Sequence, residues 1–177
     1  MAYLMLKNVP RYECILEASK HFPDLDPSAC EVFLNLLCAA DDIYHTREAL
    51  LAKHELSSGR FMVLMQLLNK MENRPQPCTP AELAEMAGVT RATMTGLVDT
   101  LERDGLVMRE PDPVDRRMMF VQLTPAGQSL LAAVMPKHFQ QMAALMRPLS
   151  EPERKTLVKL LAKVVQGSRA AVVAAPA

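Results

Sequence analysis

The sequence predicts a mainly α-helical fold that carries one small β-hairpin. Apolar residues recur at helical spacing between helix-capping signals along most of the chain. Only 6 of the 177 residues are glycine, which disfavours an all-β barrel or sandwich with many tight turns. Only two short segments have the residue pattern of strands. With 50% hydrophobic and 23% charged residues, the composition is that of a globular protein rather than a disordered one.

The N-terminal part of the chain is predicted to contain two helices joined by a short linker. Residues 12–20 have the amphipathic pattern of a short helix, and residues 21–27 form the linker. Ser28-Ala-Cys-Glu31 has the spacing of a capping box, which predicts a long helix over about 29–53. The apolar face of this long helix comprises Val32, Phe33, Leu36, Leu37, Ala40, Ile43 and Tyr44.

A third helix is predicted to open at Ser57 and to end at Asn73, because two closely following prolines cannot continue it. Thr79-Pro-Ala-Glu82 then forms a second capping box, with proline at the first helical position. This fourth helix ends at Gly88, a residue that readily takes the left-handed conformation of a helix C-terminus.

A fifth helix is predicted to begin directly after Thr90 and to run to about Arg103, before Gly105 ends it. The tight connection to the preceding helix predicts a helix-turn-helix. Two strands follow, over 106–110 and 118–123, and the charged, proline-rich segment between them is too long for a tight turn. A helix-turn-helix followed at once by such a hairpin is a winged helix. Its fifth helix is expected to bury Met94, Leu97, Val98 and Leu101.

Two further helices complete the prediction. Thr124 caps a helix that runs to about Met146 with a bend at Pro136, and Ser150-Glu-Pro-Glu153 caps a last helix that ends at Gly167. The terminal helices are more apolar than the small lobe requires, which favours a homodimer interface, although packing within one subunit would also use these residues. The predicted segments are 1–56, an N-terminal extension and dimerisation helix; 57–124, a winged helix-turn-helix lobe; 125–167, C-terminal dimerisation helices; and 168–177, a frayed tail.

Positive charge falls where a winged helix would touch DNA. The formal net charge is zero, from 20 basic and 20 acidic residues, which by itself argues against a nucleic-acid binder. An arginine nevertheless lies at the start of the fifth helix, where it could contact a base edge or a phosphate. Two more lie at the wing tip, where they could enter a minor groove. An alternative interpretation assigns no DNA contact to these residues: Thr90 only caps the fifth helix, Arg91 is solvated, and a wing arginine pairs with Asp112 or Asp115. The predicted DNA contacts are Thr90, Arg91, Thr93, Thr95, Arg116 and Arg117.

The sequence contains no pattern typical of a metalloprotein, an enzyme or a membrane protein. The four cysteines are scattered, neither cysteines nor histidines have metal-ligand spacing, and no cofactor motif is present. No catalytic motif, signal peptide or membrane span is found, so we expect a cytoplasmic protein that is not an enzyme. A winged helix that docks on protein would more often expose apolar residues at its wing than two arginines.

The chain resembles the multiple antibiotic resistance regulator (MarR) family of winged-helix repressors over about residues 29–166. The resemblance is carried by 79–95, by Leu101-Glu-Arg-Asp-Gly-Leu-Val107, and by Asp112-Pro-Val-Asp-Arg-Arg117 leading into Val121-Gln-Leu-Thr-Pro-Ala-Gly127. These segments contain a glycine, a helix cap, the wing arginines and the Thr-Pro-x-Gly sequence in the order and spacing that the family has. The extended N-terminus and Met135-Pro-Lys-His-Phe139 look most like the branch that represses multidrug efflux pumps.

The resemblance implies a homodimer that binds a pseudo-palindromic double-stranded DNA operator and is released by a small aromatic acid or phenol. A carboxylate could be held by Arg60 or His45, and Phe61 could stack on a ring. Each residue also has a structural interpretation, because His45 and Arg47 could be solvated and Phe61 is more often part of a core. A redox-sensing branch of the family suggests thiol sensing by Cys38 or Cys30 as an alternative. The candidate effector residues are Tyr44, His45, Arg47, Ser57, Arg60 and Phe61.

Overall fold

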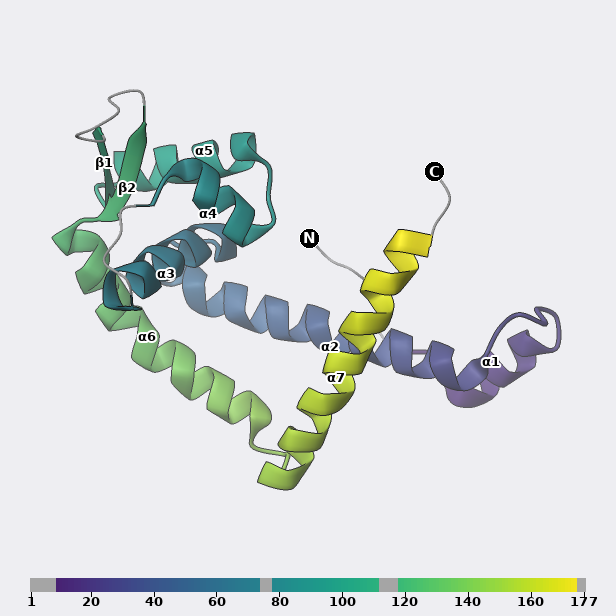
Figure 1. The fold of residues 1–177 in the computed structure, drawn as a ribbon. Helices are drawn as coiled ribbons and strands as arrows, with labels where there is room; N and C mark the ends of the chain where they lie inside the picture. The colour runs from purple at the N-terminus through teal and green to yellow at the C-terminus, as the bar shows by residue number, and fades with distance from the viewer. Residues whose placement is uncertain (1–8, 74–77, 112–117, 175–177) are drawn as a thin grey trace. The chain divides into compact units, whose positions relative to one another are not determined.

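The computed structural model describes residues 9–73, 78–111 and 118–174, and these form two compact units. One unit spans Met1–Met135 and the other Pro136–Ala177. The elements follow the order α1 (Tyr12–Ser19), α2 (Pro27–Ala52), α3 (Ser58–Asn73), α4 (Pro80–Ala87), α5 (Arg91–Arg103), β1 (Val107–Pro111), β2 (Met119–Leu123), α6 (Pro125–Met146) and α7 (Glu151–Ala174) (Figure 1). The predicted mainly helical fold with one hairpin is confirmed.

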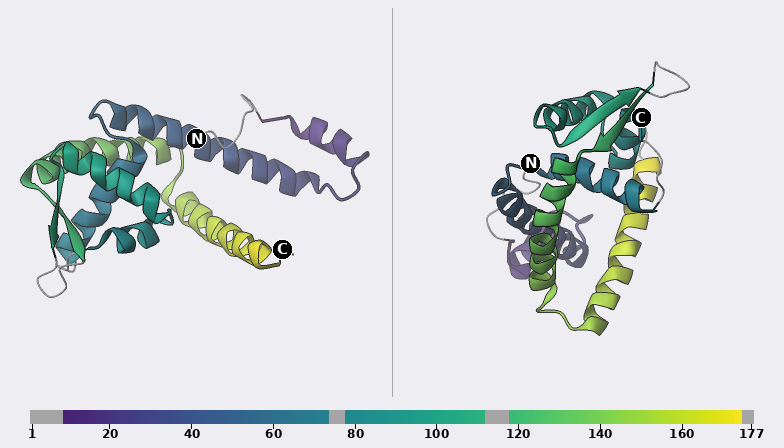
Figure 2. Two further views of the ribbon diagram at one scale, coloured as in Figure 1. Left: turned by 90° about the horizontal axis from the view of Figure 1, so that it is seen from above. Right: turned by 90° about the vertical axis from the view of Figure 1, so that its left-hand side faces the viewer.

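The hairpin is antiparallel, and the middle of β2 is joined to the segment that precedes α4. The strands pair from Val107 opposite Leu123 to Pro111 opposite Met119. The N–H of Val121 also donates to the carbonyl of Cys78 at 2.8 Å, which adds a short bridge that no sequence pattern predicted. In Figure 2 the hairpin lies beside the helix-turn-helix, and β1 contacts α5 while β2 contacts α3 and α4.

One hydrophobic core holds the first unit together. It draws on the end of α2, on α3 to α5, on the hairpin and on the first half of α6, so each element of the lobe contributes side chains. The predicted core residues of α5 are buried except Leu97, which is half-buried. The largest fully buried side chains are Leu51, Leu64, Leu83, Met94, Leu101 and Leu131, together with Val63, Val98, Val107, Val121, Val134 and Cys78.

The helix α6 is joined to the hairpin by a compact turn at the Thr-Pro-Ala-Gly sequence. The Thr124 hydroxyl donates to the carbonyl of Gly105 at 2.7 Å and accepts from the N–H of Gly127 at 3.1 Å. The Thr124 N–H donates to the carbonyl of Leu106 at 3.1 Å. A Cβ atom at Gly127 would lie 2.1 Å from that same carbonyl oxygen, so only glycine fits.

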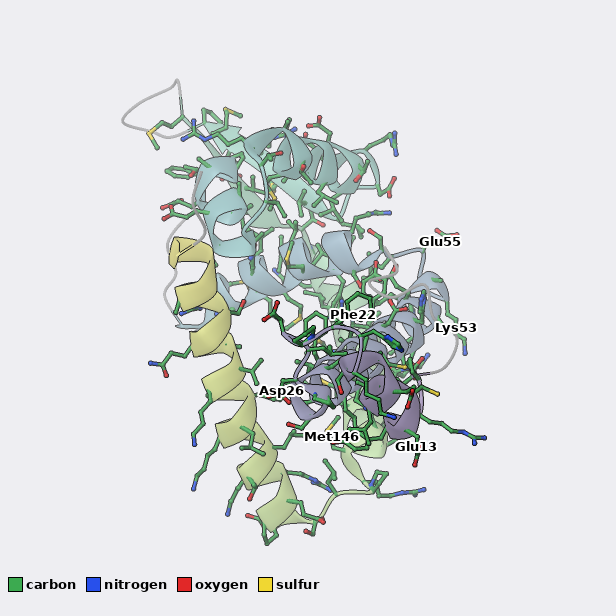
Figure 3. All side chains as sticks on the ribbon, turned by 90° about the vertical axis from the view of Figure 1, so that its right-hand side faces the viewer. Glu13, Phe22, Asp26, Lys53, Glu55 and Met146 are labelled. Atoms are coloured by element: carbon green, nitrogen blue, oxygen red, sulfur yellow. The ribbon has the colours of Figure 1, made fainter. Side chains whose placement is uncertain are left out.

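The start of α2 differs from the prediction. Asp26, and not Ser28, is the N-cap: its carboxylate accepts from the backbone N–H groups of Ser28 and Ala29 at 3.0 and 3.1 Å. Pro27 occupies the first helical position, where a missing N–H is tolerated. Asp26 and Phe22, both labelled in Figure 3, belong to the connection between α1 and α2. The predicted capping box at Ser28-Ala-Cys-Glu31 is therefore wrong by two residues.

The end of α7 also differs from the prediction. The helix passes through Gly167 without interruption and continues to Ala174, so the predicted end at Gly167 is wrong. Gly167 has no positive φ, and an interior helical glycine costs only about 1 kcal/mol, which an alanine-rich continuation tolerates. At the start of α7, the predicted cap is present in part, because the Glu153 carboxylate accepts from the N–H and hydroxyl of Ser150 at 2.7 and 2.6 Å.

Candidate nucleic-acid interface

The helix-turn-helix is fixed at both ends of its turn by the residues that the sequence indicated. Thr79 and Glu82 form a complete reciprocal capping box at the start of α4. Gly88 ends α4 with a φ of 63°, in the left-handed region, and Thr90 caps α5 by accepting from the N–H of Thr93 at 3.1 Å. The turn between α4 and α5 is therefore set by local hydrogen bonds.

The cap and the first turns of α5 expose three threonines, Thr90, Thr93 and Thr95, whose hydroxyl groups have defined partners. The hydroxyls of Thr90 and Thr93 lie 2.9 Å apart, so one donates to the other and a single hydroxyl hydrogen of the pair is left for an outside acceptor. The Thr95 hydroxyl donates to the carbonyl of Arg91 at 2.9 Å, which leaves it only acceptor capacity. The free donors of this surface therefore come chiefly from Arg91, an exposed residue at the first helical position.

The hairpin brings to α5 an arginine that was not among the predicted site residues. Arg109 lies on β1, and its guanidinium donates to Glu102 and to Asp99 at 2.6 Å each. Its backbone N–H donates to the other Glu102 oxygen at 3.2 Å. Burial disfavours the charged guanidinium, but the hydrogen bonds and charges of Asp99 and Glu102 outweigh it and raise the pKa of Arg109. Strand alternation could have found this residue, because Arg109 shares the face of the buried Val107 that packs on α5.

The predicted wing contacts Arg116 and Arg117 lie outside the described residues, as do Asp112 and Asp115. Their contribution to a DNA surface stays a prediction. The described part of the wing exposes Met108, Met118 and Met119.

Two of the candidate effector residues of α2, Tyr44 and Arg47, form a small cluster with the start of α3. The Arg47 guanidinium lies 5.7 Å from the centre of the Tyr44 ring, and its Nε donates to the Ser58 hydroxyl at 3.1 Å. Glu48 accepts from both the N–H of Ser58, at 2.9 Å, and the Ser58 hydroxyl. His45 is exposed and lies 3.7 Å from an Asp41 carboxylate oxygen. The structure therefore brings Arg47 and Tyr44 to the α2–α3 corner.

The candidate effector residues of α3 have structural roles of their own. Ser57 stands just before α3, and its hydroxyl accepts from the N–H of Arg60 at 3.3 Å. Arg60 donates to the carbonyl of Glu55 at 3.0 Å and pairs with Asp104, which follows α5. Glu55, labelled in Figure 3, lies between α2 and α3 and has a φ of 55°, which is unusual for a residue other than glycine. Phe61 is 7% exposed and belongs to the core.

The residues that the structure describes form neither a candidate metal site nor a candidate membrane-spanning helix. No three His, Cys, Asp or Glu side chains of the described ranges gather where they could hold a metal ion. Within the same ranges, no helix combines the length and apolar character needed to cross a membrane. The cysteines there are free thiols: Cys14 is exposed, Cys30 and Cys38 are half-buried, and Cys78 is buried.

Comparison with known proteins identifies the family. The sequence model of the MarR family matches residues 56–119. The HTH-type transcriptional repressor YetL of Bacillus subtilis (strain 168) is 36% identical over 156 residues, which cover 88% of this chain and 92% of that protein. The chain belongs to the MarR family. The resemblance inferred from the sequence is thus confirmed, while the assignment to the efflux-repressor branch stays a prediction.

Solved structures agree with this MarR-family assignment. The MepR–DNA complex of S. aureus superposes with a TM-score of 0.66 at 20% identity, covering 76% of this chain and 94% of that one, and shows the shared fold. BpsR of Bordetella bronchiseptica superposes with a TM-score of 0.62 at 25% identity and covers 73% of this chain and 89% of its own. The winged helix-turn-helix architecture predicted for this MarR-family protein is confirmed.

Proposed function

We propose that this MarR-family protein is a transcriptional repressor that binds a pseudo-palindromic operator through α5 and the wing. The observation that carries the proposal is the exposed start of α5, where Arg91 stands free of ion pairs among the described residues while the helix is capped by Thr90. A helix N-terminus with small polar residues and one arginine suits the major groove and its phosphates. Thr90, Thr93, Thr95, Arg116 and Arg117 complete the proposed contact surface.

DNA selection tests the proposal. The wild-type chain is used to select duplexes from a random pool, and the selected duplex and a scrambled duplex serve as labelled probes. We expect Arg91→Ala to weaken binding of the selected duplex about tenfold or more, because a base contact is worth about 1–3 kcal/mol. Arg103→Ala, at the far end of the same helix, is the matched control and should change binding little. No enrichment of any sequence would contradict the proposal.

The wing is tested in the same assay. Replacing Arg91, Arg116 and Arg117 together by alanine should abolish selective binding and leave the helical circular-dichroism spectrum unchanged. Binding of the wild-type chain should weaken steeply with salt, because each neutralised phosphate releases counterions. Retained selectivity in the triple variant would exclude the proposed surface.

We also propose that a small aromatic acid or phenol releases the DNA. BpsR, whose DNA binding is regulated by 6-hydroxynicotinic acid, supports this class of effector. Arg60 supports it from within the chain, because its buried Nε has no acceptor among the described residues and could hold a carboxylate. Arg47 and Tyr44 lie at the α2–α3 corner, whereas His45 is exposed beside Asp41. Ser57 and Phe61 lie within three residues of Arg60 in sequence.

The effector is tested by titrating 6-hydroxynicotinic acid, benzoate and phenol into the complex with the selected duplex. We expect release by at least one carboxylate and a loss of that release in Arg60→Met. The thiol alternative, through Cys30 or Cys38, is tested by hydrogen peroxide in the same assay, and release reversed by a thiol reductant would favour it. The absence of release by every aromatic probe would count against an aromatic effector.

A further inference from the structure

The proposed recognition helix carries negative charge as well as positive. Asp99 lies on the exposed side of α5 with 55% of its side chain exposed, and Glu102 lies one turn later with 38% exposed. Two carboxylates on a helix that enters a groove of DNA would repel the phosphates on either side. A positive charge from the protein that offsets part of this repulsion would therefore favour binding of α5 to DNA.

Arg109 offsets one of these two negative charges from another element. Its guanidinium spans the two carboxylates with one hydrogen bond of 2.6 Å to each, and only 21% of the arginine side chain is exposed. The Arg109 backbone N–H adds the 3.2 Å bond to Glu102, so the same carboxylate binds both the side chain and the main chain of β1. A residue held by three hydrogen bonds, two of them from a planar guanidinium, has a fixed orientation as well as a fixed distance.

Because Arg109 lies on a strand of the hairpin, these bonds also fix the position of that strand relative to α5. Arg109 pairs with Val121 across the strands, and Val121 is in turn bonded to Cys78 ahead of α4. The strand that leads to the wing tip is thus tied to α5 by side-chain ionic bonds, and its partner strand is tied to the start of α4 by a main-chain bond. No other described ion pair joins the hairpin to α5, because Arg60 and Arg103 bind Asp104 and the remaining pairs join neighbouring turns of the chain.

We propose that Arg109 is a positioning residue for DNA binding, which offsets one of the two negative charges of Asp99 and Glu102 and sets the wing relative to α5 so that both meet DNA in one register. The inference rests on the proposed function. It predicts that specificity depends on the ion pairs and not merely on the total charge of the surface, because a misplaced wing would still attract phosphates but would not match the groove spacing.

The test compares the wild-type chain with Asp99→Asn/Glu102→Gln on the selected and the scrambled duplex. Charge alone predicts that removing two carboxylates tightens binding of both duplexes. Because the change also releases Arg109, we expect the opposite for the selected duplex: its preference over the scrambled duplex should fall about tenfold or more, a loss comparable to that of one base contact. Tighter binding of both duplexes with an unchanged preference would overturn the proposal.

Arg109 itself is tested in parallel. Arg109→Gln should lose binding to the selected duplex and Arg109→Lys should keep part of it, because lysine keeps the charge but not the two-pronged geometry. Arg103→Gln, which removes an exposed arginine from α5, is the matched control. If Arg109→Gln fails to fold, the triple change Asp99→Asn/Glu102→Gln/Arg109→Gln leaves no unpaired charge, and its duplex preference should be as low as that of the double variant. A wild-type preference in the triple variant would overturn the proposal, whereas a wild-type chain that selects no duplex would contradict the proposed function instead.

Discussion

At the scale of single residues, Gly127 controls how α6 leaves the hairpin. The Leu106 carbonyl accepts the Thr124 N–H and occupies the space that a side chain at residue 127 would need. We expect Gly127→Ala to lower the free energy of unfolding by about 3 kcal/mol or more, because backbone and not a flexible side chain must move. Urea denaturation measures the effect. Gly167→Ala, with open space around the added methyl group, is the control and should not destabilise the protein.

Asp26 makes the start of α2 sensitive to acid. Hydrogen bonds from the Ala29 N–H, the Ser28 hydroxyl and the Ser28 N–H lower the pKa of this carboxyl below its ordinary value. A pKa that is lower in the folded state stabilises the fold above the unfolded pKa of about 3.9, and the contribution is lost as the pH falls through the folded pKa. We expect Asp26→Asn, which keeps a capping oxygen, to flatten this part of the pH dependence. Urea midpoints at pH 6 and pH 3 measure it, and equal pH dependence in both proteins would contradict the assignment.

At the scale of elements, α5 contains a glycine that its own fold does not require. Gly96 lies in the middle of the helix, has no positive φ, and would place an added methyl group in open space, with nothing within 4 Å. We expect Gly96→Ala to raise the free energy of unfolding by up to about 1 kcal/mol, as an interior alanine is preferred to glycine. We also expect it to weaken binding of the selected duplex, because glycine permits close approach to a ligand.

Gly167→Ala is the matched control for this prediction, since Gly167 is also an interior helical glycine with open space around it. It should stabilise α7 and leave DNA binding unchanged. If Gly96→Ala stabilised the protein without any effect on DNA affinity, the glycine would have no part in the contact.

The elements that the sequence predicted well are those whose signals are local. The Thr79 capping box, the turn at Gly88 and the cap at Thr90 are defined by residues three or four positions apart, and all three are present. The start of α2 was misplaced because Asp26 and Ser28 are both good capping residues, and the backbone conformation before Pro27 decides between them.

The part of the site that the sequence did not reveal depends on contacts between distant segments. Arg109 meets Asp99 and Glu102 only once β1 packs on α5, and Cys78 meets Val121 only once the hairpin has formed. Arg60 likewise binds Asp104 across the lobe, which no pattern along α3 indicates. Charge counts along the chain cannot show that these carboxylates are already paired.

At the scale of the whole molecule, the long helices α2, α6 and α7 each expose large apolar side chains. Surfaces of this kind mark protein interfaces, and a second copy of the chain is the occupant that the family resemblance implies. The exposed large apolar residues of these helices are Val32, Phe33 and Ile43 on α2, Phe139 and Met142 on α6, and Leu157, Val158, Leu160, Val164 and Val165 on α7.

We therefore expect a homodimer in solution whose thermal midpoint rises with protein concentration. Val158→Glu should shift the chain toward monomer in sedimentation experiments, because Val158 is 67% exposed in the single chain and a charge there would be buried on association. Lys159→Glu, at the adjacent position, is the control. A monomer in the wild-type chain at micromolar concentration would contradict the expectation.

The main-chain bond between Val121 and Cys78 has a consequence for how the lobe can move. That bond closes a loop that includes α4, α5 and β1, and Val121 is 1% exposed, so its amide should exchange with solvent only when β2 separates from the segment before α4. Amides near the ends of α7 need only local fraying to exchange. We expect Val121 to be among the slowest amides, with and without effector. Release of DNA would then come from displacing an intact lobe and not from partial melting of its recognition surface.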